Sequence, residues 1–262
     1  MMRVFVQSVG LIGPGLAGWK TGQCVLGGLA PYHVATMPKP IPDILPPTER
    51  RRSSDAVRLA VAVAQEAMSA SGMDADSVAT VFASSEGDGA VTHKICEVLA
   101  SAERDLSPTL FHNSVYNAPA GYWSIATGSR MPSTSLCGWD FSFAGGLLEA
   151  AGQVTVERHS VLLIAFDLPL PAPLYAVRPV EQGLAAALLL TPHLTPSSLM
   201  RWDITVMQGG SPSPMPEMMP TGLRNNSVGR CLPLLQALAR QRTHTVQLEY
   251  VGGNCAVVKC HS

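Results

Sequence analysis

The feature that most constrains the fold is an uninterrupted apolar run, Ser160–Phe166, because a strand this apolar is typically buried on both faces of a sheet. A helix is predicted over residues 54–72, where Ser54 or Asp55 caps the start and Gly72 the end. Other apolar segments read as buried strands, namely Val4–Leu11, Ser77–Ser84, Gly183–Thr191 and Leu199–Val206. Strands that alternate with helices predict an α/β fold with both sheet faces covered.

The second half of the chain continues this pattern and then breaks it. A helix near residues 118–126 and a short strand near Ser133–Leu136 precede a helix from Phe141 to about Val156. Residues 208–227 are rich in Gly, Pro, Ser and Met, which predicts a flexible loop. After this loop we expect a helix from about Val228 to Arg242 and a terminal hairpin, with strands at residues 245–250 and 256–259.

Composition narrows the class of protein. The chain has 262 residues, 14% charged and 47% apolar, with a net charge of −1, so it carries no field that would gather nucleic acid or anionic lipid. So little charge beside so much apolar content suggests extra buried surface, such as an oligomer interface. No apolar run reaches the length of a membrane span, and the N-terminus reads as a strand rather than a signal peptide. The six cysteines show no CxxC spacing, so we expect reduced thiols in the cytoplasm.

Motifs for metals and cofactors are absent from the sequence. There is no Walker loop, no Rossmann GxGxxG and no zinc spacing, so we expect no metal and no cofactor. Glu86-Gly87-Asp88-Gly89 has paired carboxylates that could bind a cation, but a tight turn explains these residues better.

The most informative stretch runs from Leu106 to Ala150, where the sequence resembles the β-ketoacyl synthases, the condensing enzymes of the thiolase superfamily. In that family a Ser-Pro start, an Asn, an Ala-Gly helix start and Gly, Arg and Pro-Ser precede the strand that leads to the nucleophilic cysteine. The residues that match without a gap are Ser107, Pro108, Asn117, Ala120, Gly121, Ile125, Gly128, Arg130, Pro132, Ser133 and Ser135. Glu149-Ala150 matches the end of the following helix, and Gly252-Gly253-Asn254 resembles the family's terminal hairpin.

This resemblance implies a truncated thiolase-like (ketosynthase) fold, with a mixed central sheet covered by helices and most of the C-terminal half missing. Residues 1–262 would form a single ketosynthase-like domain. Residues 1–207 would be the N-terminal-half core, 208–227 the flexible loop, and 228–262 a remnant helix and hairpin of the C-terminal half.

The register places Asp140 where the family has its cysteine. A condensing enzyme needs a thiolate there, and a carboxylate is a weak nucleophile toward thioesters. We therefore expect Asp140 to be a helix N-cap rather than a catalytic residue. Cys137, three residues earlier, is either a buried free cysteine or, less favoured, a repositioned nucleophile. Trp139 and Phe141 flank the position and would fill space that substrate normally occupies.

The family's two active-site histidines are also missing. In the family they occur in a Glu-x-His-Gly-Thr motif and in a Lys-…-Gly-His motif, and neither motif is present here. His193 is expected to lie in a surface turn, and His244 at the start of a terminal strand, so neither is expected to be catalytic.

The resemblance therefore implies a non-catalytic subunit, similar to the chain-length factors of aryl polyene and xanthomonadin-type pigment clusters. It would pair with a full-length β-ketoacyl synthase in polyketide or fatty-acid-like biosynthesis and meet acyl carrier protein through that complex. Ser133–Leu136 and Leu110–Trp123 would form the interface. Candidate residues of the acyl tunnel or the interface are Phe111, Tyr116, Asn117, Trp123, Ser135, Trp139, Phe141 and Phe143. For any single aromatic among them, ordinary core packing is the alternative.

Two other functions stay open at this point. The chain could be an acyltransferase or thioesterase on acyl-carrier-protein thioesters that uses Cys137 or Asp140. It could also be a homodimeric scaffold that recruits carrier protein.

Overall fold

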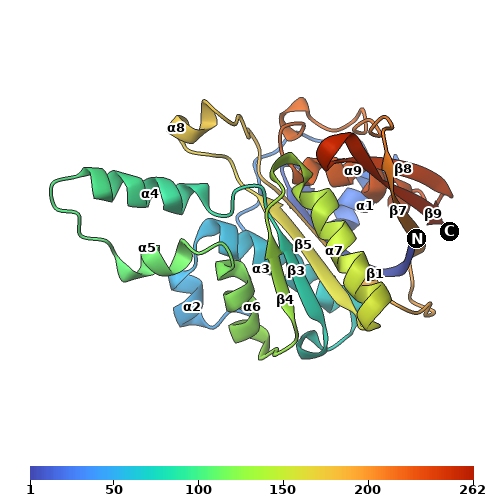
Figure 1. The fold of residues 1–262 in the computed structure, drawn as a ribbon, viewed down its shortest axis with the longest axis horizontal. Coiled ribbons are helices and arrows are strands. Elements are labelled where there is room, and N and C mark those ends of the chain that lie inside the picture. Colours follow the sequence, from blue (N-terminus) through green and yellow to red (C-terminus); the bar gives the residue numbers. More distant parts are fainter.

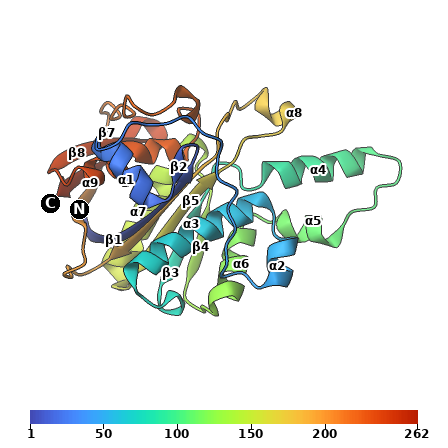
Figure 2. The same ribbon diagram turned by 180° about the vertical axis from the view of Figure 1, so that it is seen from behind.

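A nine-stranded mixed sheet forms the centre of the computed structural model, which describes residues 1–262. The spatial order of the strands is β4-β3-β5-β6-β1-β7-β9-β8, with the short β2 paired to β1 (Figures 1 and 2). The strands are β1 (Met2–Gly13), β2 (Leu16–Ala17), β3 (Ala79–Ala83), β4 (Ser133–Leu136), β5 (Val161–Asp167), β6 (Leu184–Thr191), β7 (Met200–Gln208), β8 (His244–Tyr250) and β9 (Asn254–His261).

The helices surround this sheet. They are α1 (Trp19–Gly27), α2 (Pro47–Arg52), α3 (Asp55–Ser71), α4 (Gly89–Ala100), α5 (Pro108–Asn113), α6 (Ala118–Thr127), α7 (Ser142–Glu157), α8 (Ala172–Tyr175) and α9 (Leu232–Ala239). Short 3-10 turns occupy residues 75–77, 139–141, 221–223, 228–231 and 251–253. None of the helices is long and apolar enough to cross a membrane.

The apolar run that opened the sequence argument is confirmed as the middle strand β5. All seven of its residues are buried, and it pairs parallel to β3 and antiparallel to β6. Alternate residues enter different cores: Leu162 and Ile164 pack with α3 and α6 on one face, while Leu163 packs with α7 on the other. Both faces of this part of the sheet are therefore covered, as an α/β fold requires.

The caps predicted for the first long helix are confirmed. The Ser54 hydroxyl accepts the Val57 N–H at 3.3 Å, and Gly72 ends α3 in the left-handed conformation at φ 68°. These caps satisfy backbone groups that a helix end would otherwise leave unpaired.

The C-terminal segments extend the same sheet rather than forming a second unit. β7 pairs antiparallel to β1 and β9, and β8 closes the edge of the sheet. On the outer face of this end, Asp203 accepts from the Arg3 guanidinium at 2.7 Å, and this hydrogen bond holds the pKa of Asp203 below its ordinary value.

The helix predicted over residues 228–242 is shorter than expected. A 3-10 turn occupies Val228–Cys231, and α9 begins at Leu232 with Pro233 in its first turn, where the missing N–H costs no helical bond. The loop predicted over residues 208–227 begins with the last residue of β7, and residues 209–227 contain no strand or α-helix. The end of this segment is anchored because Leu223, Asn226 and Ser227 are buried.

Two segments project from the sheet and its covering helices on the same side of the molecule. The arm formed by α4 and α5, residues 89–113, projects away from the sheet, and the segment around α8 projects near it (Figures 1 and 2). Only Val91 of α4 and Asn113 of α5 are buried, so this arm has little core of its own.

Candidate functional site

The site centres on the turn between β4 and α7, which we call the nucleophile turn (residues 137–141). Trp139 adopts a left-handed backbone conformation at φ 55°, which costs a non-glycine residue roughly 1–2 kcal/mol. The Ser142 hydroxyl stabilises this conformation: it accepts the Gly138 N–H at 3.0 Å and lies 2.7 Å from the Trp139 carbonyl oxygen. The turn is thus held rigidly at the start of α7.

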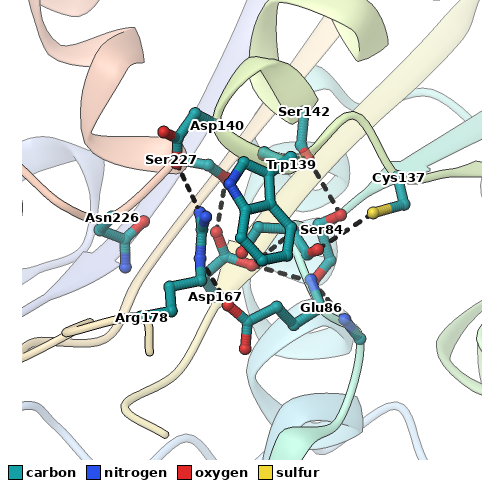
Figure 3. A network of polar contacts seen from close by, with 12 residues as sticks. Ser84, Glu86, Cys137, Trp139, Asp140, Ser142, Asp167, Arg178, Asn226 and Ser227 are labelled. Atoms are coloured by element: carbon teal, nitrogen blue, oxygen red, sulfur yellow. Dashed lines mark hydrogen bonds and ion pairs between the residues drawn. The ribbon is translucent and has the colours of Figure 1, made fainter. Parts of the chain in front are cut away.

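Asp140, in the family's nucleophile position, is bound by two arginines. Its Oδ1 lies 2.8 Å from a guanidinium nitrogen of Arg178 (Figure 3), and its Oδ2 lies 3.5 Å from one of Arg230. The expectation that Asp140 caps the helix is wrong. The N-cap position of α7 is Phe141, and no side chain bonds to the helix start there, because the carboxylate turns to the two cations instead.

Each arginine has a second acidic partner and an aromatic neighbour. Arg178 also pairs with Glu86, and Arg230 also pairs with Glu249. The Arg178 guanidinium lies 4.4 Å from the centre of the Trp139 ring, and that of Arg230 lies 5.8 Å from the centre of the Phe141 ring. We call Asp140, Arg178, Arg230, Glu86 and Glu249 the arginine clamp.

The clamp determines the chemical environment of Asp140, the residue at the nucleophile position. Both oxygens of Asp140 face guanidinium groups, so their lone pairs are engaged in charge-assisted contacts. Burial raises the pKa of Glu86, and the Arg178 cation opposes this shift. The Asp140 carboxylate is thus held between two cations, an arrangement that differs from the thiolate that a condensing enzyme needs at this position.

Cys137 lies beside the clamp and is exposed. Its thiol donates to the Ser85 carbonyl oxygen at 3.0 Å, so the group beneath the sulfur is an acceptor rather than a cation or a base. No histidine contributes a hydrogen bond or ion pair to the clamp or to Cys137 (Figure 3). The buried-cysteine interpretation is wrong, because the turn leaves this side chain at the surface.

A buried carboxylate, Asp167, lies behind the clamp at the end of β5. It accepts from the Ser84 hydroxyl at 2.9 Å, the Ser85 N–H at 2.8 Å and the Ser227 hydroxyl at 2.5 Å (Figure 3). Burial raises the pKa of Asp167, and these hydrogen bonds oppose the shift. Asp167 thereby connects the ends of β3 and β5 to the segment before α9.

Tyr116 is the predicted tunnel residue that reaches this network. Its hydroxyl lies 2.5 Å from the carbonyl oxygens of Ser84 and Leu136 and accepts the Ser84 N–H at 3.1 Å. Burial raises the pKa of this phenol. Tyr116 therefore joins the ends of β3 and β4 next to the nucleophile turn.

The other predicted residues are spread over the molecule. Phe111 is 64% exposed on the arm, Asn117 is exposed at the start of α6, and Ser135 lies on β4 at the edge of the sheet. Trp123 and Phe143 are each 1% exposed and belong to the cores on opposite faces of the sheet. The structure therefore gathers Tyr116, Cys137, Trp139, Asp140 and Phe141 at one place but not Phe111, Trp123 or Phe143.

The paired carboxylates of residues 86–89 have structural partners. Glu86 pairs with Arg178, and Asp88 caps α4 by accepting the Val91 N–H at 2.9 Å. No group of three His, Cys, Asp or Glu residues is placed to hold a metal ion.

Sequence reasoning missed Arg178, Arg230, Glu249 and Asp167. Asp167 follows the apolar run of β5 directly, which was a signal that the end of this strand carries a functional or structural anion. Arg178 and Arg230 had no comparable local signal, because they come from the α8 excursion and from the segment before α9.

Comparisons with known proteins agree with this fold. A family model described as the β-ketoacyl synthase N-terminal domain matches residues 29–250. The structure of a ketosynthase (ApeO) in complex with its chain length factor (ApeC) from Xenorhabdus doucetiae is similar, with 20% identity, a TM-score of 0.76 and coverage of 99% of this chain and 100% of the matched chain.

Two further solved structures are matched over nearly their whole chains. The ishigamide ketosynthase/chain length factor shows 11% identity and a TM-score of 0.72, with coverage of 100% of this chain and 99% of the other. The AntDE:AntF complex, a type II PKS acyl-carrier protein with its ketosynthase bound to the hexaketide, shows 13% identity, a TM-score of 0.75 and the same coverage. A search of curated proteins finds no match.

The structural likenesses establish the truncated thiolase-like fold, in which chains of this extent occur within ketosynthase assemblies. The family model covers most of the chain, and all five residues of the arginine clamp lie within the matched range. This chain therefore belongs to the β-ketoacyl synthase family.

Proposed function

We propose that this chain is a non-catalytic ketosynthase-like subunit, a chain-length factor, that pairs with a full-length β-ketoacyl synthase. The observation that carries the proposal is the arginine clamp. At the position where a condensing enzyme has its thiolate, this chain has an Asp whose two oxygens face Arg178 and Arg230. The partner would then supply the cysteine and both histidines.

The free edge of the sheet supports the pairing. β4 ends the strand order and is paired on one side only, to β3. The Thr80 N–H bonds to Pro132 and the Ser84 N–H bonds to Leu136, so the even-numbered residues of this segment face β3. Because backbone groups alternate along a strand, those of Ser133 and Ser135 face outward and are available to a strand of the partner.

The projecting arm supports the same surface. Apolar side chains on and near it are exposed, with Leu99 at 52%, Phe111 at 64%, Val115 at 48% and Ile125 at 55%. Scattered exposed apolar residues are ordinary, but Leu99 and Phe111 lie on an arm with little core of its own, and Val115 and Ile125 follow it in the chain. We expect a ketosynthase partner to bury it.

The similar structures support the identity of the partner. Two of them are ketosynthases with chain length factors, and the third is an acyl-carrier protein in complex with its ketosynthase. For this chain we propose the same kind of heterodimer, which would meet acyl carrier protein as a complex. All six cysteines are free, which fits the expected cytoplasmic location.

In this heterodimer the chain would form one wall of the acyl tunnel and limit product length by steric exclusion. Phe111, Tyr116, Trp139 and Phe141 are the aromatic residues of the predicted wall or interface set that are at least partly accessible. Trp123 and Phe143 are buried within this chain, which is the core alternative that the sequence left open.

The proposal is tested by intact-protein mass spectrometry. The reconstituted pair is incubated with acyl-loaded carrier protein, and both subunits are weighed. We expect an acyl adduct on the partner alone, and the same product yield when this chain carries Cys137→Ala. An adduct on this chain that disappears in Cys137→Ala would overturn the proposal and favour the acyltransferase alternative.

A further inference from the structure

A hollow of about 380 Å³ lies at the surface between the segment before α2, α2 itself and the first turn of α3. We call it the α2 hollow. Its lining includes four cations, Lys39, Arg50, Arg51 and Arg58, and no acidic residue. Without these four charges the net charge of the chain would be −5 instead of −1, so positive charge gathers here against the balance of the molecule. The hollow therefore has the electrostatic character of an anion site.

Two of the four cations are held in place by contacts within the chain. The Arg58 guanidinium donates to the Ser53 hydroxyl at 3.2 Å and to the Arg50 carbonyl oxygen at 3.0 Å, and its side chain is only 24% exposed. The Arg50 guanidinium donates to Asp43 at 3.3 Å. Guanidinium groups that are already fixed lose little freedom when they bind an anion, and their planar forks match phosphate oxygens.

The charges of the hollow are not cancelled by its surroundings. Lys39 and Arg51 are exposed and form no ion pair. The two acidic neighbours, Asp43 and Asp55, pair with one arginine each and are 82% and 80% exposed. Ion pairs of such exposed groups contribute about 0–1 kcal/mol, so an anion with more than one charge can compete with them.

A stiff backbone frames the hollow. Residues 38–47 contain five prolines, each of which fixes its own φ angle. Pro42 and Leu45 are buried and anchor this segment to the body of the molecule. The same segment supplies the apolar residues of the lining, which are Pro40, Ile41 and Pro47. The site is thus preformed, with cations beside an apolar wall.

We infer that the α2 hollow binds the diphosphate group of a small soluble molecule. A diphosphate spreads several negative charges over two adjacent groups, which suits four neighbouring cations better than a single carboxylate does. The volume lies in the range of small-molecule sites, and the apolar wall can contact an organic body attached to the diphosphate. No residue of the arginine clamp lines the hollow, so this inference goes beyond the proposed function and does not depend on it.

The test is isothermal titration calorimetry on the full chain in metal-free buffer of fixed ionic strength. We expect inorganic pyrophosphate to bind about tenfold or more tightly than sulfate, the effect of at least one added charge-assisted hydrogen bond. Adenosine diphosphate distinguishes the source of the diphosphate. Tighter binding than pyrophosphate indicates an organic diphosphate and equal binding indicates the free ion, and either result supports the inference.

Two variants of exposed, unpaired residues test the location without threatening the fold. Arg51→Met and Lys39→Met should each weaken pyrophosphate binding about fivefold or more. Arg242→Met is the matched control, because Arg242 is exposed and follows α9, which lies away from α2 (Figure 1), and its affinity should change less than about twofold.

Three results would overturn the inference. The first is equal binding of sulfate and pyrophosphate, or no binding of either. The second is an unchanged affinity in both hollow variants. The third is displacement of bound pyrophosphate by an equal concentration of a glutamate-rich peptide, which would assign the hollow to an acidic protein surface. Because the titration needs no ketosynthase, a failure to form the heterodimer would contradict the proposed function and leave this result standing.

Discussion

Replacing Arg178 with methionine tests the clamp most sharply. The Arg178 side chain is only 7% exposed and contacts Asp140, Glu86 and the Trp139 ring. Removing one partner from a buried ion pair costs about 3–5 kcal/mol. Asp140 is 38% exposed and water will solvate it in the variant, so we expect a loss near the lower end, about 3 kcal/mol.

The loss should depend on pH in a defined direction. Burial already raises the pKa of Glu86, and the Arg178 cation opposes that shift. Without the cation the folded-state pKa rises further above its unfolded value. A carboxyl group whose pKa is raised by folding destabilises the folded state as the pH rises through that pKa. The loss in free energy of unfolding caused by Arg178→Met should therefore be smaller at about pH 5 than at about pH 8.

The assay is urea unfolding followed by circular dichroism at both pH values. Arg224→Met is the matched control, because Arg224 is exposed and forms no ion pair, and its free energy of unfolding should change by less than about 0.5 kcal/mol. A deficit below about 1 kcal/mol for Arg178→Met, or one that does not change with pH, would refute the view that the clamp holds the nucleophile turn.

Three further predictions concern the edge strand, the aromatics and acid stability. Ser135→Pro removes an outward-facing N–H of β4 and should weaken binding to the ketosynthase in calorimetry, while Ser135→Ala should not; equal affinities would contradict the edge-strand interface. Phe111→Ala should change product length by mass spectrometry without loss of stability, whereas Trp123→Ala should cost about 3–5 kcal/mol in urea unfolding; the reverse pattern would exclude Phe111 from the tunnel wall. The Arg3 hydrogen bond lowers the pKa of Asp203 in the folded state, and this stabilises the fold at pH values above the ordinary carboxyl pKa. Arg3→Met removes that stabilisation, so acid unfolding should begin at a higher pH. An unchanged midpoint of acid unfolding would contradict this.

Much of the fold was predictable from local signals. The strands β3 and β5 follow from short apolar runs, and α3 follows from its period and its two caps. The helix before the terminal hairpin was predicted too long, because Pro233 can start a helix but cannot lie inside one.

The site was only half predictable. The ungapped register was enough to place Asp140 in the family's nucleophile position. Its role could not be predicted, since Arg178 and Arg230 reach it only when distant segments fold back. A polar residue at a helix start suggests a cap by local rules, and long-range ion pairs override those rules here.

The central claim is that this chain works as the non-catalytic half of a heterodimer. The most direct test is to purify the tagged chain from its native host, identify its partners by mass spectrometry and measure stoichiometry by light scattering. We predict a 1:1 complex with a β-ketoacyl synthase that carries the cysteine and both histidines. A homodimer of this chain without such a partner would contradict the account, and Cys137 would then be the residue to test for chemistry.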